Sequence, residues 1–266
     1  MESWYIMQWS KAKTYIILAL IFTNTVLFFT TMHTKNFFDS GISSSNVENL
    51  NKVLTGIGVQ NNAKIDTKQI EVHPLVVDFI SEDSSHGDIF ENINMKYHNN
   101  LKIIDEIYYE ISLNCDDMKN IENKAKFAVK WLEDMFPGDE YKLKKYIRSD
   151  FGTTLSYEEF YAGYFVGRGY VNFSFNEDDS LEISILKVKK TFDVNKTTKA
   201  ISSAQALALA LSKLKKGDII NDISLGYDVP QNNEYVTDES KTRTIKMMPY
   251  WRIKVNYNDY IYIQAI

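Results

Sequence analysis

The sequence "SSAQALALALSKLKKG", residues 202–217, carries the strongest helix signal in the chain. Alanine and leucine favour helices, the two serines can cap the start, and lysines in the last turn match the negative end of the helix dipole. Gly217 can end the helix because glycine adopts the left-handed backbone of a helix C-terminus. We therefore predict a helix at residues 203–215.

Strand patterns lie on both sides of this helix. Before it, the aromatic stretch "YEEFYAGYFVGRGYVNFSF" (157–175) and the alternating stretch "LEISILKVKK" (181–190) predict strands joined by a hairpin loop at residues 177–180. After it, "DIINDISLGYDV" (218–229) is followed by "PYWRIKVNY" (249–257) and "DYIYIQAI" (259–266), which predict a terminal hairpin around Asn258 and Asp259. We expect Trp251 to be buried beneath the helix and Ile253 to lie on the opposite face of its strand.

A second group of elements precedes residue 141. The stretches "IEVHPLVVDFI" (70–80) and "LKIIDEIYYEISLN" (101–114) are β-branched and aromatic, and Pro74 interrupts the first. A helix is predicted at residues 117–135, capped by Asp116 or Asp117 and stopped by Pro137 and Gly138. The sequence thus predicts an α+β fold with two units, at residues 63–140 and 141–266, each a helix packed on an antiparallel sheet.

The segment nearest the N-terminus has a different character. Residues 15–32, "YIILALIFTNTVLFFTTM", carry no charge and would form a helix about 27 Å long, close to the about 30 Å hydrocarbon core of a bilayer. Because no A-x-A-like cleavage site follows, we predict an uncleaved transmembrane helix. Lysines before the span favour a cytoplasmic tail at residues 1–14, and so a single-pass protein of the cell membrane whose remaining chain is extracytoplasmic.

The link between the span and the first unit is rich in serine and asparagine. It lacks a sustained apolar period, so residues 33–62 are predicted to form a stalk. Cys115 is the only cysteine, so no internal disulfide can form and the outer region must be stabilised by packed cores. The formal net charge of −5 argues against nucleic acid as a partner.

Two regions of the chain resemble a known family. The N-terminal "MQWSKAKTYIILALIFTNTVLFF" (7–29) and the C-terminal "AQALALALSKL" (204–214), "DISLGYDV" (222–229) and "MPYWRIKVNYNDYIYIQAI" (248–266) are similar to the YycI family, also called WalI. The resemblance implies a non-enzymatic regulator of an essential bacterial two-component system for cell-wall metabolism. It also implies no cofactor, and association with the membrane sensor histidine kinase WalK/YycG and with a YycH-like protein.

Polar residues inside the predicted span suggest a contact between helices. An asparagine amide is costly in hydrocarbon unless a neighbouring helix bonds it, and small residues four apart allow close backbone approach. The alternative is that the threonine hydroxyls and the amide are satisfied within their own helix. We predict a partner-helix interface that consists of Ala19, Leu20, Thr23, Asn24 and Leu27.

Enzymatic chemistry finds little support in the sequence. The four histidines, His33, His73, His86 and His98, are scattered and match no zinc motif. We interpret "SHGD" (85–88) as a polar turn, Cys115 as unreactive beside two aspartates, and the glycines around Arg168 as a bulge or a site of close strand packing.

The tyrosines and phenylalanines of residues 161–175 are interpreted as sheet core. The alternative function is an extracytoplasmic ligand-binding or sensing module, with this tyrosine-rich sheet as its surface and a groove at Tyr164 and Tyr170. A membrane-anchored hydrolase comes third.

Overall fold

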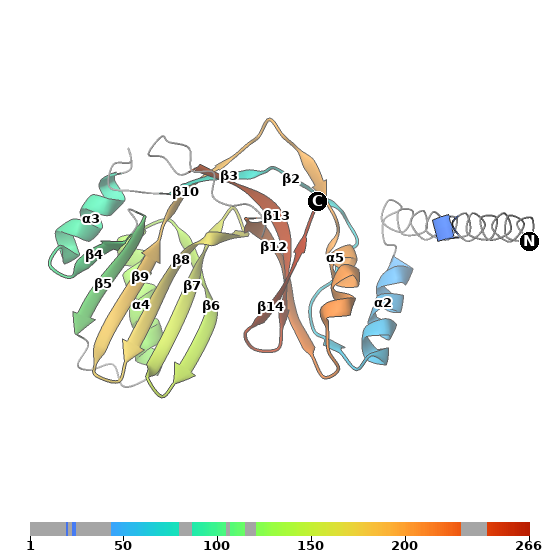
Figure 1. Cartoon of the computed structure of the whole chain (residues 1–266), viewed down its shortest axis with the longest axis horizontal. Coiled ribbons are helices and arrows are strands. Elements are labelled where there is room, and N and C mark those ends of the chain that lie inside the picture. The colour runs from blue at the N-terminus through green and yellow to red at the C-terminus, as the bar shows by residue number, and fades with distance from the viewer. Residues whose placement is uncertain are drawn as a thin grey trace, which may run out of the picture.

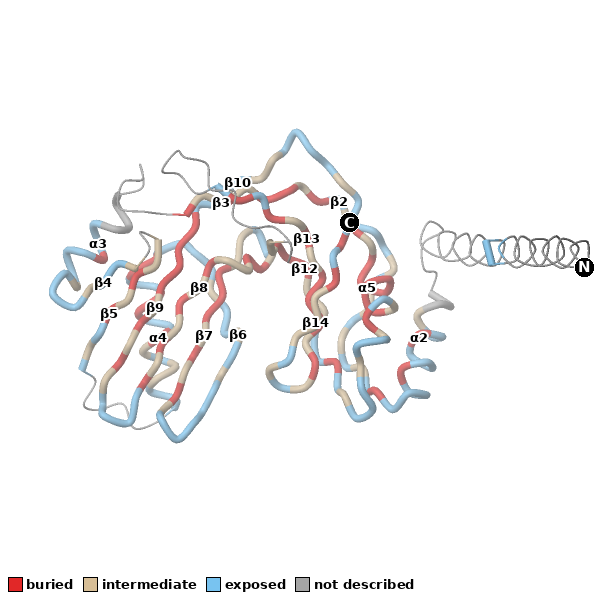
Figure 2. The backbone as a smooth tube through the Cα atoms, viewed as in Figure 1, coloured by how far each residue is buried: buried red, intermediate tan, exposed pale blue. Residues whose placement is uncertain are grey.

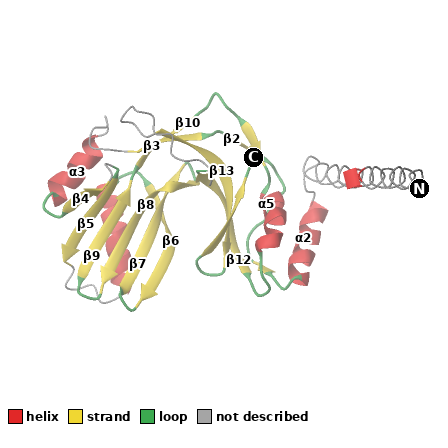
Figure 3. Ribbon diagram, viewed as in Figure 1, coloured by secondary structure: helices red, strands yellow, loops and turns green. Residues whose placement is uncertain are grey.

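The computed structural model describes residues 20, 23–24, 44–79, 87–104, 107–114, 121–229 and 244–266. Helices and strands alternate irregularly along the chain, as expected for an α+β protein (Figures 1 and 3). The helices are α2 (Ser44–Gly56), α3 (Gly87–Tyr97), α4 (Ile121–Met135), α5 (Ser203–Ala210) and the 3₁₀ turn η1 (Leu211–Lys213). The strands are β1 (Gln60–Asn61), β2 (Ile70–Val72), β3 (Leu75–Phe79), β4 (Leu101–Ile104), β5 (Tyr108–Asn114), β6 (Glu140–Ser149), β7 (Gly152–Tyr161), β8 (Tyr164–Asn176), β9 (Ser180–Leu186), β10 (Val188–Phe192), β11 (Thr198–Ala200), β12 (Ile219–Asp228), β13 (Thr244–Val255) and β14 (Asp259–Gln264).

One large sheet organises the described residues. The sheet has twelve strands, of which eight follow the path β10-β3-β13-β12-β8-β9-β5-β4. The other four pair off this path: β1 with β12, β14 with β13, β7 with β8, and β6 with β7. Most pairs are antiparallel, but β12 and β8 run parallel and pair only at Gly226 with Phe165 and at Tyr227 with Val166. This short pairing joins a left half, β4 to β9 with α3 and α4, to a right half, β12 to β14 with α2 and α5 (Figure 1).

The left half has its own hydrophobic core beneath α4. Trp131 of α4 packs edge-on against Phe173 of β8 with ring centroids 5.5 Å apart, and its Nε1 donates to the Tyr97 hydroxyl at 2.9 Å. Phe165, Phe173 and Phe175 are buried, which confirms that the phenylalanines of this stretch are sheet core (Figure 2). The predicted helix at 117–135 is confirmed from Ile121 onward, whereas its cap at residues 116–117 lies outside the described residues.

The right half is built around α5. Ser202 and Gln205 form a capping box, in which the Ser202 hydroxyl accepts from Gln205 N at 3.2 Å and the Gln205 side chain accepts from Ser202 N at 2.8 Å. As predicted, Trp251 is buried beneath this helix. Its Nε1 donates to Ile201 O at 2.8 Å. Ile253 shares that face, so the prediction of the opposite face is wrong, because residues two apart in a strand point to the same side.

The second predicted helix is shorter than expected. It ends at Ala210, continues as the 3₁₀ turn to Lys213, and Leu214 is already extended, so residues 214–215 are not helical. Gly217 does adopt a left-handed φ of 92°, but in the turn before β12 rather than at the helix end. The hairpin loops at 177–180 and before β14 are confirmed by the β8–β9 and β13–β14 pairing.

The predicted stalk at residues 33–62 is wrong from Ser44 onward. Residues 44–56 form α2, and Leu50 and Leu54 are buried in the same core as α5 and Trp251. Val59, just beyond α2, belongs to this core too, and β1 adds to β12 in parallel. The segment therefore packs as part of the right half because its few apolar side chains recur at helical spacing.

The predicted boundary between residues 140 and 141 is also wrong. Strand β5 pairs with β9, and β3 pairs with both β10 and β13, so each half draws on residues from before and after the boundary. The core beneath α4 includes Leu155 and Ile183. Two helix-on-sheet halves exist, but they interleave in sequence, because α4 covers strands that mostly follow it in the chain.

Candidate functional site

The predicted partner-helix interface lies at the edge of what the structure describes. Leu20, Thr23 and Asn24 are helical and exposed, whereas Ala19 and Leu27 lie outside the described residues. Within the part of the chain that is described, we find no helix with both the length and the apolar character of a membrane span. The interface therefore stays a prediction.

A charged cleft lies where the two halves face each other. One wall is the face of β12 to β14 that points away from α5, and the other is the edge formed by β6 and β7. The cleft has a volume of about 440 Å³. Its lining consists of Lys142, Leu143, Lys144, Glu158, Phe160, Gly163, Asp222, Ser224, Arg252, Lys254 and Tyr260.

A carboxylate bonded by two cations forms the base of this cleft. Glu158 of β7 is only 2% exposed; its Oε1 accepts from Lys144 Nζ at 2.8 Å, and its Oε2 accepts from Arg252 Nη1. Burial alone would lower the pKa of Lys144, but the charge and hydrogen bond of Glu158, together with Tyr262, outweigh burial and the pKa is raised. The Arg252 guanidinium also lies 4.1 Å from the ring centroid of Phe165 and 5.2 Å from that of Tyr260. Lys144 is thus held charged, and the two rings hold Arg252 in a fixed orientation.

Two hydrogen bonds join the edge strand β6 to β14 and to the turn before β14 across the cleft. The Tyr260 hydroxyl donates to Lys144 O at 2.6 Å, and Asn258 Nδ2 donates to Tyr146 O at 3.0 Å. Burial raises the pKa of Tyr260, so its hydroxyl keeps the proton that it donates. These contacts fix the distance between the two walls.

A second ion cluster lies on the other side of β7, around the next residue. Glu159 is fully buried, and its Oε1 accepts from both Lys187 Nζ and Lys190 Nζ. Lys187 also donates to Asp139 Oδ2 at 2.5 Å and to the Tyr141 hydroxyl at 3.0 Å. Burial and the nearby carboxylates hold the pKa of Tyr141 well above its ordinary value, whereas the two lysines overcome the effect of burial and lower the pKa of Asp139. Glu159 and the side chains of both lysines are buried, whereas Asp139 lies at the exposed rim of the cluster.

Two glycines of β8 make room for carboxylates, one fully buried and one half-buried. A Cβ on Gly169 would lie 2.4 Å from Glu159 Oε2, and a Cβ on Gly167 would lie 2.6 Å from Cγ of Asp228. This confirms that the glycines around Arg168 are sites of close packing. Burial raises the pKa of Asp228 despite the nearby charges of Arg168 and Lys144.

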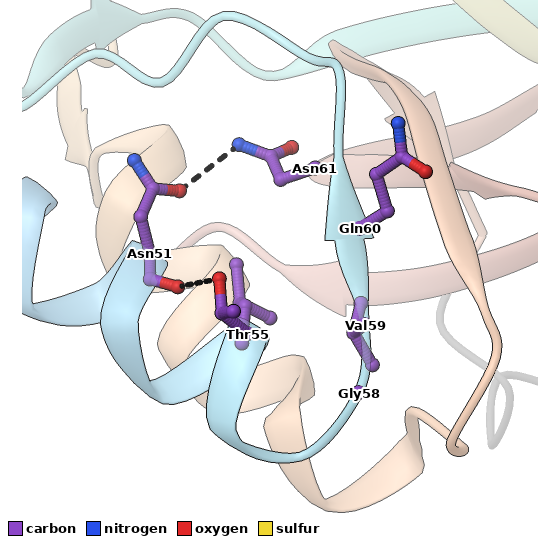
Figure 4. A pocket seen from close by; sticks show the side chains of 7 residues that line it. Asn51, Thr55, Gly58, Val59, Gln60 and Asn61 are labelled. Carbon is purple, nitrogen blue, oxygen red and sulfur yellow. Dashed lines mark hydrogen bonds between the residues drawn. The ribbon is translucent and has the colours of Figure 1, made fainter.

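A second hollow, of about 410 Å³, lies between α2 and β1. Figure 4 shows Asn61 Nδ2 directed at Asn51 Oδ1, a bond of 3.3 Å, and the Thr55 hydroxyl bonded to Asn51 O at 2.9 Å. No charged side chain lines it in the described chain. The two amides tie α2 to β1, which gives these polar groups a structural role.

The residues weighed for metal binding or catalysis are not brought together in the described part of the chain. Among the described residues, no group of three or more His, Cys, Asp or Glu side chains could hold a metal ion. His73 Nδ1 lies 3.0 Å from Lys196 O, and His98 is exposed on a turn, so neither is near the cleft. Ser85, His86 and Cys115 lie outside the described residues.

Sequence reasoning missed every charged residue of the cleft. One signal was present: Glu158 and Glu159 stand side by side in an otherwise aromatic strand, where adjacent residues point to opposite faces and one of the two must face a core. Their partners could not be found in this way, because Arg252 is 94 residues away in sequence.

The comparisons with known proteins give one positive finding. A family model described as "YycI protein" matches residues 39–266. No curated protein sequence matches the chain significantly. The matched range spans both halves, the cleft and all four labelled helices.

Proposed function

The chain belongs to the YycI family, and on that premise we propose that it is a non-enzymatic accessory protein that contacts a membrane sensor histidine kinase and a YycH-like protein. YycI is a regulatory family, associated with the YycG/WalK two-component system. The protein would adjust the activity of that kinase.

The match over residues 39–266 carries this proposal. It covers the whole two-half fold, including the segment at α2 that the sequence alone did not place in a core. A match confined to one motif would support only a shared local structure, whereas this one supports a shared role for the entire outer region.

We further propose that residues 15–32 anchor the protein in the cell membrane as a single span with a cytoplasmic N-terminus. Ala19, Leu20, Thr23, Asn24 and Leu27 would then contact a helix of the kinase or of the YycH-like partner. An interhelical hydrogen bond in a bilayer contributes about 0.6–2 kcal/mol, so one polar residue can alter the association measurably.

Site-specific crosslinking in native membranes tests this function. Asn24→Leu, and separately Thr23→Leu, should reduce crosslinking to the kinase by about fivefold, the equivalent of about 1 kcal/mol. Both variants should stay in the membrane, because leucine makes the span more apolar. Leu18→Ile, apolar and off the proposed interface, is the control. Equal capture of the kinase by all variants at matched protein levels would refute the interface. Failure of the wild-type protein to capture the kinase or a YycH-like partner at all would refute the proposed function.

The ligand-binding alternative is supported by the charged cleft, although not at the place expected. Tyr164 packs edge-on against Tyr227 at 5.5 Å and against Phe192 at 6.4 Å, so its ring belongs to a core between strands. Neither it nor Tyr170 lines the cleft. A sensing role would therefore use the side chains around Arg252 instead of the tyrosine-rich sheet.

A further inference from the structure

We propose that the cleft between the two halves binds a small anion through a phosphate or carboxylate group, held by Lys144, Ser224, Arg252 and Lys254. This site goes beyond the contact with a kinase and does not depend on it.

The charges that line the cleft leave a positive excess. Four cationic side chains, those of Lys142, Lys144, Arg252 and Lys254, face two acidic ones, those of Glu158 and Asp222. Lys142 is also paired, at 2.9 Å, with Glu140, which lies outside the lining. When Glu140 is counted as well, the four cations face three carboxylates. One positive charge remains uncompensated in a chain whose formal net charge is −5. Local positive charge in a concave, partly buried site attracts anions.

The excess is concentrated at Glu158, where a single carboxylate is shared by two cations. Arginine carries five N–H donors in a rigid fork, and the contact with Glu158 uses Nη1. Stacking on Phe165 fixes the plane of that fork before any ligand arrives. An incoming oxyanion would thus meet donors already in place, and this lowers the entropy lost on binding.

Ser224 provides an independent sign of a missing partner. Its Oγ is buried in the lining of the cleft and has no hydrogen-bond partner among the described residues. Ser224 is directly opposite Arg252 in the β12–β13 register, so both side chains reach the same face of the sheet. An unsatisfied buried hydroxyl costs about 1–3 kcal/mol, and an oxygen of a bound anion would remove that cost.

The size of the cleft fits a small molecule. Its volume of about 440 Å³ falls within the range of about 300–1,000 Å³ that is usual for ligand pockets. The same chemistry could come from a soluble phosphorylated or carboxylated compound or from the headgroup of an anionic lipid. Because its groups come from β6 and β7 on one side and β12 to β14 on the other, a ligand in the cleft would join the two halves.

Calorimetric titration of the full-length protein in uncharged detergent, at constant ionic strength, tests the site. The probes are inorganic phosphate, glycerol phosphate and acetate. Phosphate or acetate binding should weaken about tenfold in Lys254→Gln and about threefold to tenfold in Ser224→Ala, the range expected for a lost charged and a lost neutral hydrogen bond. Lys126→Gln is the control, because Lys126 is exposed on α4 and paired with Glu122.

Ser224→Ala also gives a signature that a merely structural serine would not. Removing an unpaired buried hydroxyl should leave the unfolding temperature of the ligand-free protein unchanged or raise it, while anion binding becomes weaker. Co-sedimentation with phosphatidylglycerol vesicles, compared with phosphatidylcholine vesicles, tests whether the ligand is a lipid headgroup. If it is, the protein should bind the phosphatidylglycerol vesicles, glycerol phosphate should displace it from them, and Lys254→Gln should not bind them. Binding of the soluble probes alone, with the same dependence on Lys254, identifies a soluble ligand. No binding of any probe or vesicle, or equal binding by Lys254→Gln and Lys126→Gln, overturns the proposal.

Discussion

Glu158 and Glu159 are neighbours on β7, and each is a buried carboxylate that accepts hydrogen bonds from two cations. Glu159 is bonded by Lys187 and Lys190, whose side chains are 3% and 8% exposed, and Asp139 lies at the exposed rim of this cluster. Glu158 lies beneath an open cleft, and its partner Lys144 is 29% exposed. One arrangement of charges thus occurs twice: once in what we call the sealed cluster, where both cations at the glutamate are buried, and once in the cleft, where one of the two is accessible.

The difference teaches how the surroundings decide what a buried ion pair does. Desolvation of both ions is offset only when every charge is paired, so the sealed cluster serves the fold and tolerates little change. Water can replace a lost partner in the open cleft, so the same chemistry there can be used to bind a ligand. Changes on the Glu159 side should therefore act on stability, and changes on the Glu158 side mainly on binding.

The largest effect is expected for Glu159→Gln. The neutral amide leaves Lys187 and Lys190 buried with Asp139 as their remaining carboxylate, and removal of one partner from a buried pair costs about 3–5 kcal/mol. Glu159 Oε2 has no hydrogen-bond partner in the described chain, so the new NH₂ group at that position would be unpaired as well. Urea unfolding of the full-length protein, followed by tryptophan fluorescence, measures the loss. A loss below about 1 kcal/mol, the size of an exposed pair, would show that this cluster is not sealed.

The glycines of β8 test the same contrast through packing. Gly169→Ala should lower the free energy of unfolding by about 2–3 kcal/mol, because the new methyl group meets Glu159, which is fully buried and cannot move. Gly167→Ala should cost only about 1 kcal/mol, because the Asp228 side chain that it meets is half-buried and can turn toward solvent. Equal losses in the same urea experiment would contradict the distinction between a carboxylate that is fully buried and one that can turn toward solvent.

Glu158→Gln should cost about 1–2 kcal/mol, less than the change at Glu159, because water in the cleft can solvate Lys144. It should also strengthen phosphate binding, since it removes the carboxylate that competes with an anion for Arg252. Paired measurements of urea unfolding and phosphate affinity separate the two effects. A loss of stability equal to that of Glu159→Gln, or weaker phosphate binding, would contradict the comparison.

Local signals in the sequence predicted the local parts of the fold. The serine cap at Ser202, the hairpin loop at 177–180 and the burial of Trp251 each depend on residues close together in the chain or on strand alternation. The helix at α2 was missed although Val47, Leu50 and Leu54 recur at spacings of three and four, because its serines and asparagines obscured the pattern. Greater weight on periodicity than on composition would have found it.

The remaining features depend on pairings between distant segments. Strand alternation shows which residues share a face but not that β5 inserts beside β9, nor that β12 meets β8 in parallel over two residue pairs. The cleft exists only because of those pairings. Its residues therefore looked like ordinary surface charges in the sequence, and only the pair of acids in β7 stood out.

The smallest effect, and the most specific, concerns pH. The pKa of Asp139, in the sealed cluster, is lowered, so its charged form stabilises the fold above the unfolded value of 3.8, and this contribution is lost as the pH falls below that value. The pKa of Asp228, near the cleft, is raised by burial, so Asp228 binds its proton at a higher pH in the native state than in the unfolded state. Its contribution therefore has the opposite sign: stability is gained as the pH falls through the raised pKa toward 3.8.

Two variants isolate these opposite signs. Asp139→Asn should be less stable than the wild type at pH 7 and approach it under acidic conditions, whereas Asp228→Asn should be more stable at pH 7 and lose that advantage as the pH falls. Urea midpoints measured from neutral pH down to about pH 2, with both variants compared to wild type at each step, report the two trends, because the Asp139 contribution is lost only below its unfolded pKa. Exposed carboxylates elsewhere titrate equally in all three proteins, so the differences cancel their contribution. Parallel pH trends in the two variants would mean that the two sides of β7 do not differ electrostatically, and the contrast between a sealed and an open carboxylate would then have to be abandoned.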